Sequence, residues 1–596
     1  MRVGRISKVS AVALAAVLVL SACTGTDSGP QQPTATASAS VGGNVTVLET
    51  DAFSSFNPES VTGATRTNLR VDYATHSGFN YVDPNLVIQK NEQFGKYQKV
   101  SDDPLVIKYT INKGVQWSDG APVTAADLLL QWAAASGYYN DATLDADYKV
   151  IKGTAYFHSA GDPTGIANTE RPVISDEGMS LTLTYKKPFS DWETALGSTV
   201  SIPAHIVAVR SGLKDADALS ALLESVSRGD ADAPVAPNAT LRKVADFWNT
   251  GFDTKSMPDP SLALSNGAFL VKSINADTDL VLTPNADYAW GAKPKLDTLT
   301  VHYAPDGDPQ VAALKEGGAD VISPTATAEV SAALTAAKSK GIVVDQGQGL
   351  GFDQVALNFK GVFSNADFRT AFLKSVPRQE IVRELAVPLD SKAVALNSFV
   401  FRQSQTPYKE SARSNGSTSY ADVDIDGAKI ILAEAKPSIR ILYNVDDPVR
   451  AKEYALIAAS AELAGFAVTN AGMPAATWQT ALKAGEFDVA LFGWKANATG
   501  SVQVPQVFRT GALSNVNNFS NTVVDQLTED LASNPNDAKQ DALKMQIDKL
   551  VFDAGYGVPL FARDSILAHS AHVGGVRFSP VDVGAWWNVW EWTHIS

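Results

Sequence analysis

The sequence predicts an α/β fold with a parallel sheet, divided into two or more lobes. Residues 439–443 have the pattern of a strand, 450–463 of a helix, 466–468 of a short strand, 477–484 of a short helix and 487–492 of a buried strand. Such alternation is typical of βαβ units, whose strands run parallel. The 596 residues are too many for one hydrophobic core, so we expect at least two lobes.

The last strand of this series gives the clearest indication of a site. Its sequence is FDVALF, and Gly493 ends the run too early for a typical helix. A short apolar run of this kind is typical of a strand that is covered on both faces. Ligands of such sheets lie beyond the carboxyl ends of the strands. We therefore expect a site at the loops formed by residues 444–447 and 494–500.

Three residues of the second loop suit a solute. Trp494 can stack on it, and Lys495 or Asn497 can form hydrogen bonds with it. The alternative is that Trp494 only caps the core.

Composition argues against several functions. Hydrophobic residues make up 45% of the chain and charged residues 19%, which is typical of globular proteins. The formal net charge of -15 and the lack of a long basic run argue against nucleic-acid binding. Of seven histidines only His569 and His572 are close in sequence, so we predict no metal site and no cofactor.

The N-terminus predicts export. Arg2, Arg5 and Lys8 precede an apolar stretch, residues 9–20, that is too short to be a good membrane span. The stretch ends in LSAC, and Cys23 is the only cysteine of the chain. This segment resembles the lipobox of bacterial lipoproteins, in which the cysteine receives a lipid after cleavage. An ordinary secretory signal with a chance cysteine is the alternative.

The resemblance assigns residues 1–22 to a signal peptide and Cys23 to lipidation. Residues 23–43 are rich in Thr, Ser, Ala, Gly and Pro and predict a flexible tether. With Cys23 lipidated, the chain has no second cysteine for a disulfide. We therefore expect a soluble body anchored to the outer face of the bacterial cell membrane.

The first part of the mature chain has strand and turn signals. Residues 45–48 predict a first strand, and residues 107–111 alternate apolar and polar side chains like a half-buried strand. Thr124 and Asp127 have the spacing of a capping box, and Gly137 is placed to end the helix that follows.

Residues 114–127, GVQWSDGAPVTAAD, resemble the signature of the family 5 extracellular solute-binding proteins, the peptide, dipeptide and nickel receptors of ABC importers. Further segments resemble the family's motifs in the family's order. They are SNGAF at 265–269, PNADYAW at 284–290, LKEGGAD at 314–320, LN at 357–358 with ADFRTAF at 366–372, GEFDVALFGW at 485–494 and VPL at 558–560. The resemblance covers the chain from about Val45 to its end.

The resemblance implies a two-lobe clamp like that of periplasmic binding proteins, of the large three-subdomain type with mixed sheets. Lobe I would comprise residues 44–303 and 560–596, with a subdomain at about 79–200, and lobe II residues 304–559. Chain crossings near Tyr303 and Leu560 would form a hinge, and closure would trap the ligand.

The implied function is a lipid-anchored receptor that captures a solute, foremost an oligopeptide, and delivers it to the permease and ATPase subunits of an ABC transporter. We expect a monomer. The alternative is an envelope lipoprotein of the same fold that senses or scaffolds glycolipid metabolism without transport. The chain has no Gly-x-Ser-x-Gly, His-Glu-x-x-His or P-loop motif, so we predict no enzyme.

Two positions depart from the family's pattern. Peptide-binding members have an Asp three residues after the tryptophan, which pairs with the peptide's amino terminus; here this residue is Asn497. Dipeptide-type members have an Arg near the end of the strand at 439–443, and residues 442–446, LYNVD, contain none. A longer peptide bound through its backbone, or a neutral or glycosylated ligand, fits better than a free dipeptide. The candidate ligand-binding residues are Trp494, Lys495, Asn497, Tyr443, Asn444, Thr67 and Asn68.

Overall fold

The computed structural model describes residues 39–40, 42–144, 150–161, 163–275, 277–495, 499–512 and 514–595. Cys23, the signal peptide, Asn497 and the tether up to residue 38 lie outside these ranges, so the predictions about them stay predictions. Residues from Ala39 to Ser596 form one compact unit, which is described below. Within the described ranges, no helix combines the length and the apolar character needed to cross a membrane.

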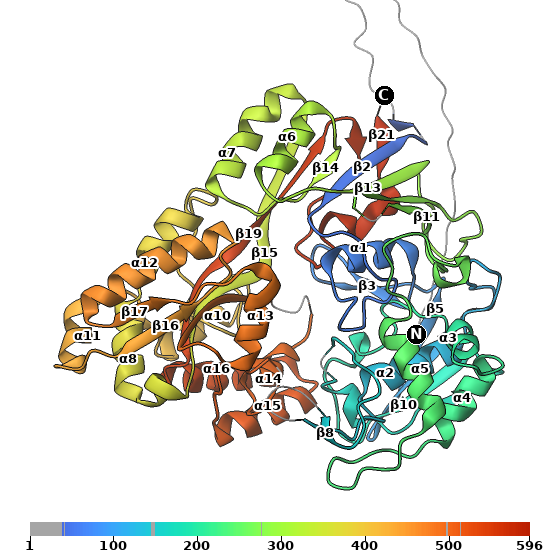
Figure 1. Ribbon diagram of the computed structural model, residues 1–596, viewed down its shortest axis with the longest axis horizontal. Helices are drawn as coiled ribbons and strands as arrows, with labels where there is room; N and C mark the ends of the chain where they lie inside the picture. Colours follow the sequence, from blue (N-terminus) through green and yellow to red (C-terminus); the bar gives the residue numbers. More distant parts are fainter. Residues whose placement is uncertain are drawn as a thin grey trace, which may run out of the picture. The chain divides into compact units, whose positions relative to one another are not determined.

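A ten-stranded mixed sheet forms the centre of the molecule (Figure 1). Its strands, in spatial order, are β11 (Phe269–Asn275), β12 (Asp279–Pro284), β13 (Thr298–Tyr303), β2 (Asn44–Glu49), β14 (Val321–Ile322), β19 (Gly557–Ser570), β15 (Ile342–Leu357), β18 (Val489–Lys495), β16 (Ser438–Leu442) and β17 (Ala467–Asn470). The pairs β13–β2, β2–β14, β16–β17 and β16–β18 are parallel, and the other pairs are antiparallel.

The two longest strands, β15 and β19, pair over most of their length and join the two lobes. At one end of the pair, Ile342 and Ala568 belong to the hydrophobic cluster that contains Leu48. At the other end, Val355 and Leu560 belong to the core of the second lobe. The ribbon formed by β15 and β19 is therefore shared by both lobes.

The ribbon contains a bulge. Gln348 pairs with Asp564 and Phe352 pairs with Ala562, so residues 349–351 of β15 lie opposite the single residue Arg563 of β19. Extra residues of this kind bend a strand and interrupt its ladder of hydrogen bonds.

The first lobe combines one end of the sheet with a smaller four-stranded sheet. Its strands, in spatial order, are β5 (Gly95–Asp102), β6 (Leu105–Ile111), β10 (Ser180–Thr184) and β9 (Val173–Ser175). The predicted capping box is confirmed: the backbone N–H of Thr124 donates to Asp127 Oδ2 at 2.7 Å, at the start of α2. Gly137 has a φ of +66°, in the left-handed region, directly after this helix. The predicted strands at 45–48 and 107–111 correspond to β2 and β6.

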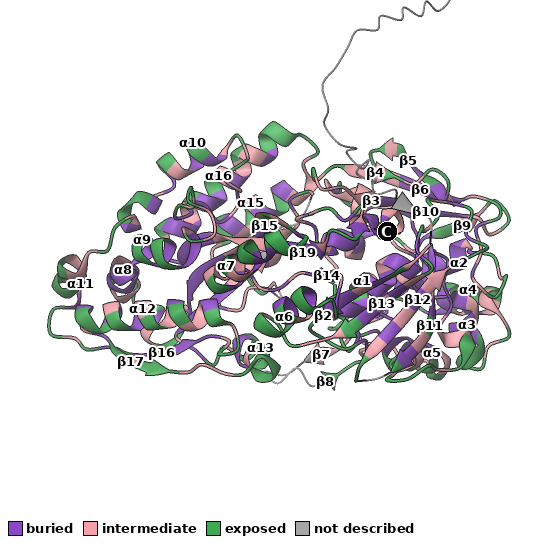
Figure 2. Cartoon of the chain, turned by 90° about the horizontal axis from the view of Figure 1, so that it is seen from above, coloured by how far each residue is buried: buried purple, intermediate pink, exposed green. Residues whose placement is uncertain are grey.

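The second lobe contains the predicted series β16-α12-β17-α13-β18, and the parallel pairing of its strands is confirmed. Side chains of β18 are buried on both faces, as predicted. Val489 and Leu491 pack into the main core of the lobe, whereas Ala490 and Phe492 pack into a second cluster with Leu482. Helix α12 covers the sheet with one face, and Figure 2 shows its alternating buried and exposed segments.

The helices are α1 (Arg66–Thr75), α2 (Ala125–Ala135), α3 (Ala204–Arg210), α4 (Ala216–Ser225), α5 (Ala239–Thr250), α6 (Asp308–Glu316), α7 (Ala328–Ala337), α8 (Ala366–Ser375), α9 (Arg378–Ile381), α10 (Tyr408–Ser414), α11 (Ile425–Leu432), α12 (Pro448–Ala464), α13 (Ala475–Ala484), α14 (Gln503–Phe508), α15 (Thr522–Ser533) and α16 (Asp537–Asp553). The remaining strands are β1 (Ala39–Ser40), β3 (Asn80–Val82), β4 (Ile88–Lys90), β5 (Gly95–Asp102), β6 (Leu105–Ile111), β7 (Thr143–Leu144), β8 (Val150–Lys152), β9 (Val173–Ser175), β10 (Ser180–Thr184), β20 (Val573–Gly574) and β21 (Thr593–Ile595).

Candidate functional site

Two cavities lie at the bulge of β15 and share residues 349–352 and Trp494. The first has a volume of about 360 Å³ and the second of about 380 Å³. Both are within the size range of small-molecule sites. Residues 84–86 of the first lobe and residues 398–405 of the second line the first cavity. The two cavities therefore form one cleft that both lobes enclose.

The first cavity is lined by aromatic and neutral polar side chains. Its aromatic residues are Phe352, Phe399, Phe401, Trp494 and Phe508, and its neutral polar residues include Asn85, Gln348, Ser398, Gln403, Ser404, Gln405 and Thr499. This lining is suited to uncharged ligand groups, because aromatic faces bury apolar area and amides can both donate and accept hydrogen bonds.

The charged side chains of the first cavity are both positive. No carboxylate is among the described residues that line it, and its two cations are Arg402 and Lys544. The Lys544 ammonium lies 3.1 Å from Asp541 and 5.2 Å from the centre of the Phe401 ring. The described lining of the first cavity thus offers no negative partner to a cationic ligand group.

The second cavity is lined by charges of both signs, and four of them are paired with one another. Asp353, whose side chain is 1% exposed, accepts a hydrogen bond of 2.9 Å from Arg450 Nη2 and one of 2.6 Å from Arg563 Nε. Asp447 accepts a third bond, of 2.7 Å, from Arg563 Nη2 and lies 3.3 Å from Arg450 Nη1. These four residues, the Asp353 network, hold two cations and two anions, so they balance.

Burial and charge act in opposite directions on the acids of this region. Burial raises the pKa of Asp353, but the guanidiniums of Arg563 and Arg450 outweigh it and hold the pKa below its usual value. Glu453 is fully buried beside the network, and burial together with the charge of Asp353 raises its pKa well above the usual value. Glu453 therefore favours its neutral form, and the network stays balanced.

The predicted residue Trp494 lines both cavities and also packs against both hydrophobic clusters of β18. Its ring meets Phe492 edge-on at 5.3 Å. It thus combines the two roles considered from the sequence, cap of the core and wall of a cavity. Lys495 is the last residue of β18 and pairs with Gly351.

The structure does not bring the other four predicted residues to the lining of either cavity. Tyr443 is buried and stacks on Tyr454 at 4.7 Å, and Asn444 Oδ1 accepts from the backbone N–H of Asp446. Thr67 and Asn68 are buried near the start of α1.

The partners of Thr67 and Asn68 lie within the first lobe. Thr67 Oγ1 donates to the carbonyl of Asp51 at 2.8 Å, and Asn68 Nδ2 donates to the carbonyl of Gly63 at 2.9 Å. Asn68 Oδ1 accepts from the N–H of Ser54 at 2.9 Å. In the structure, both side chains hold the loops around α1 in place.

The loop at residues 398–405, which was not predicted from the sequence, supplies a large part of the lining of the first cavity. Its sequence, SFVFRQSQ, places three consecutive apolar residues in a segment without a helix or strand. An apolar run in such a loop is the local signal that could have identified it.

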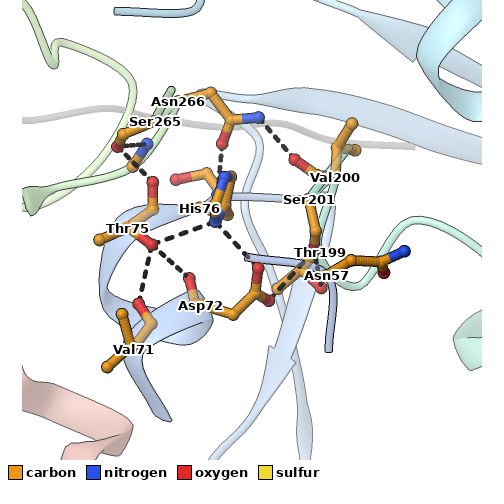
Figure 3. A network of polar contacts seen from close by, with 12 residues as sticks. Asn57, Val71, Asp72, Thr75, His76, Thr199, Val200, Ser201, Ser265 and Asn266 are labelled. Atoms are coloured by element: carbon orange, nitrogen blue, oxygen red, sulfur yellow. Dashed lines mark hydrogen bonds and ion pairs between the residues drawn. The ribbon is translucent and has the colours of Figure 1, made fainter. Parts of the chain in front are cut away.

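A second buried polar network, the His76 network, lies at the end of α1 (Figure 3). His76 Nε2 lies 3.1 Å from the carbonyl of Leu264, which can only accept, so this nitrogen carries a proton. His76 Nδ1 lies 2.9 Å from Asp72 Oδ1, and Ser201 Oγ donates to Asp72 Oδ2 at 3.1 Å. One proton must therefore lie between His76 and Asp72.

Glu59 lies in the electrostatic field of this network. Burial is the largest effect on Glu59 and raises the pKa of its carboxyl group to about 7. The charge of Asp72 also raises this pKa, whereas the hydrogen bond from Gln131 and the charge of His76 lower it. These groups face one another inside the first lobe and have no part in either cavity.

His569 and His572 each lie near a backbone carbonyl. His569 Nδ1 lies 2.9 Å from the carbonyl of Ser570, and His572 Nδ1 lies 3.3 Å from that of Ile595. In the described part of the chain, no three His, Cys, Asp or Glu residues are grouped so that they could hold a metal ion.

Comparison with known proteins identifies relatives over nearly the whole chain. Residues 90–515 match the family model described as "Bacterial extracellular solute-binding proteins, family 5 Middle". An uncharacterized lipoprotein of Mycobacterium leprae is 24% identical over 594 residues, which cover 98% of this chain and 96% of that protein. The oligopeptide-binding protein OppA of Mycobacterium tuberculosis is 24% identical over 469 residues, 77% of this chain and 69% of that protein.

Solved structures share the fold. The periplasmic EDTA-binding protein EppA superposes with a TM-score of 0.78 at 21% identity, covering 96% of this chain and all of EppA. The oligopeptide-binding protein AppA of Bacillus subtilis, solved with a nonapeptide, superposes with a TM-score of 0.69 at 18% identity, covering 94% of this chain and all of AppA. The predicted two-lobe fold with mixed sheets is confirmed.

Proposed function

Because the chain belongs to the bacterial extracellular solute-binding proteins of family 5, which are receptors and not enzymes, we propose that it captures an oligopeptide between its lobes and delivers it to an ABC permease. The observation that carries this proposal is the pair of cavities that meet at residues 349–352 and are enclosed by both lobes. The oligopeptide binding named for OppA and the nonapeptide of AppA support it.

The charges of the cleft indicate which peptides it takes. A free amino terminus is a cation, and burying a cation without a partner is costly. The described lining of the first cavity offers no carboxylate, and residues 496–498 are Ala, Asn and Ala. The carboxylates Asp353 and Asp447 of the second cavity already bind two guanidiniums. We therefore propose that the ligand is a peptide whose amino terminus is blocked or lies outside the first cavity.

A pooled selection tests this proposal. A mixed-sequence pentapeptide pool is prepared in four forms: free, N-acetylated, C-amidated, and modified at both ends. After incubation with the full-length protein and removal of unbound peptide, mass spectrometry measures the enrichment of each form. We expect the N-acetylated forms to be enriched at least as much as the free ones, because the first cavity offers no described carboxylate to a free amino terminus. Preferred capture of free amino termini would contradict the charge argument, and capture of no peptide would contradict the oligopeptide function.

Two variants locate the site in the same assay. Trp494→Ala removes a wall that both cavities share, so we expect capture of free and acetylated peptides to fall alike, by up to about ten-fold. Asn497→Asp adds a carboxylate at the position where peptide-binding members have one, and should improve capture of free peptides by about five-fold and leave acetylated peptides unchanged. If neither variant changes capture, the ligand does not bind beside Trp494.

We further propose that Cys23 carries a lipid that anchors the receptor outside the cell membrane. The relatives named as lipoproteins support this. Cys23→Ala should release the protein into the medium or leave its signal peptide uncleaved, as measured by fractionation and intact mass. Unchanged processing and membrane retention of Cys23→Ala would contradict the proposal.

The position of the hinge is also a proposal. The sequence suggested crossings near Tyr303 and Leu560. The parallel pairing of β14 with β2 groups residues that follow Tyr303 with the first lobe, so we place the bending region along the β15–β19 ribbon, at its bulge. Exchange of backbone amide hydrogens should respond to a captured peptide at residues 348–352. A response confined to Tyr303 and its neighbours would favour the original position.

A further inference from the structure

We propose that Asp191 is a latch that holds the two lobes closed over the first cavity. Asp191 belongs to the first lobe, between β10 and the short helix Trp192–Thr194. Its Oδ2 atom accepts hydrogen bonds from the backbone N–H groups of Ser501, at 2.8 Å, and Val502, at 2.7 Å. These two residues belong to the second lobe and lead into α14.

The backbone at Gly500 is shaped for this contact. Gly500 has a φ of +79°, and a β-carbon at this position would lie 2.4 Å from Asp191 Oδ2. Any other residue would therefore push the carboxylate away and would be strained as well. The close approach of Asp191 depends on the missing side chain of Gly500.

Two further contacts join the segment before Asp191 to α15 of the second lobe. The backbone N–H of Ser190 donates to the carbonyl of Ala532, near the end of α15, at 2.8 Å. Lys187 also forms an ion pair with Glu529 of α15. Both side chains of this pair are at least half exposed, so it adds little to stability. Asp191 is the centre of the contact because its charge binds two N–H groups at once.

The latch is connected to the ligand site through a short segment. Thr499, Gly500 and Ser501 line the first cavity. Ser501 Oγ donates to Gln540 Oε1 at 2.7 Å, which ties this segment to α16 of the second lobe. A solute in the first cavity thus contacts the segment that Asp191 holds, and opening of the cleft must break both bonds to Asp191.

A weaker contact joins α12 to α7. There Lys452 of α12 lies 3.1 Å from Glu329 of α7, and both side chains are more than half exposed. Water screens such a pair. This ion pair is therefore weaker than the contact at Asp191.

Amide hydrogen exchange of the full-length protein, without added ligand, tests the latch. In Asp191→Ala we expect exchange to become about ten-fold faster or more, because hydrogen bonds to a charged acceptor are lost. The effect should include cleft-lining residues that do not touch Asp191, namely residues 84–86 of the first lobe and 398–405 of the second. Faster exchange confined to residues 190–194 and 499–503 would overturn the proposal, because Asp191 would then stabilise only its own loop.

Two further variants control for local damage. Asp259→Ala removes a carboxylate that accepts from the N–H of Ser261 and pairs with Arg210, all within the first lobe, and should change exchange near residue 259 only. Gly500→Ala keeps the charge of Asp191, but the added β-carbon occupies the space of the Asp191 carboxylate. We therefore expect this variant to open the cleft as Asp191→Ala does. If Asp191→Ala does not fold, Asp191→Asn, which retains an acceptor oxygen, should give a smaller increase at the same sites. Unchanged exchange at residues 84–86 in a folded Gly500→Ala protein would contradict the latch.

Discussion

The Asp353 network and the His76 network both hold buried charge, but they neutralise it differently. Asp353 and Asp447 are balanced by two guanidiniums, which stay charged at every pH a protein tolerates. Asp72 is balanced by His76, which is charged only while it keeps its proton. The carboxylates of the Asp353 network are therefore neutralised by cations that keep their charge, whereas Asp72 in the first lobe is neutralised by an imidazole.

Asp353→Ala should have the largest effect on this comparison. It leaves Arg450 and Arg563 without one of their two carboxylates in a buried site, and loss of a buried partner costs about 3–5 kcal/mol. Urea unfolding measures the change in the free energy of unfolding. A loss below about 1 kcal/mol would mean that water screens the network despite its burial.

The second prediction concerns pH and the first lobe. Burial raises the pKa of Glu59 to about 7 in the folded protein, from the ordinary value of 4.5. Between these values the folded state binds a proton that the unfolded state has lost, so this group makes stability fall as pH rises. Its contribution is at most about 1.4 kcal/mol per pH unit and levels off above pH 7.

Glu59→Gln should remove this part of the pH dependence, and its amide oxygen can still accept from Gln131. Unfolding in urea at several pH values from 4.5 to 8 measures the difference between the two proteins. Parallel curves for wild type and Glu59→Gln would show that Glu59 titrates normally.

Arg450→Lys tests whether geometry matters as well as charge. Arg450 reaches Asp353 and Asp447 at the same time, and a lysine keeps the charge without the fork of donors. We expect a loss of about 1–2 kcal/mol in the free energy of unfolding. Equal stability of Arg450→Lys and wild type would mean that the positive charge alone is sufficient.

The smallest effect on the free energy of unfolding should come from the exposed ion pair of Lys452 and Glu329. Lys452→Ala removes the partner of Glu329, and we expect a change below about 1 kcal/mol, reduced further by salt. The same urea titration at low and high salt measures it. A loss comparable to that of Asp353→Ala would remove the distinction between buried and exposed charges.

The structure contains the elements that local sequence patterns predict. The capping box at Thr124 and the buried strand β18 depend on neighbours within a few residues, so the sequence displays them directly. The series from β16 to β18 follows for the same reason. Trp494, which follows Gly493 near the end of β18, was predicted in the same way, and it lines both cavities.

The rest of the site depends on residues that are distant in sequence. Arg563 lies 210 positions from Asp353, and Asp191 lies 310 positions from Ser501, so no spacing rule connects them. Thr67 and Asn68 were predicted to bind the ligand, and in the structure their side chains donate hydrogen bonds to backbone carbonyls of the first lobe. A polar residue near a strand end does not show by itself whether its partner is a ligand or the protein.

The shared ribbon of β15 and β19 has a consequence for how the sequence can change in length. One added residue in a strand turns every following side chain to the other face. Because the ribbon carries core residues of both lobes, such an insertion would disturb both at once. The ladder is already interrupted between Gln348 and Phe352 and again between Phe352 and Gln354, so an added residue disturbs the pairing least there. Among relatives, we therefore expect insertions and deletions to collect in the surface loops, and those within the ribbon to fall at its bulge.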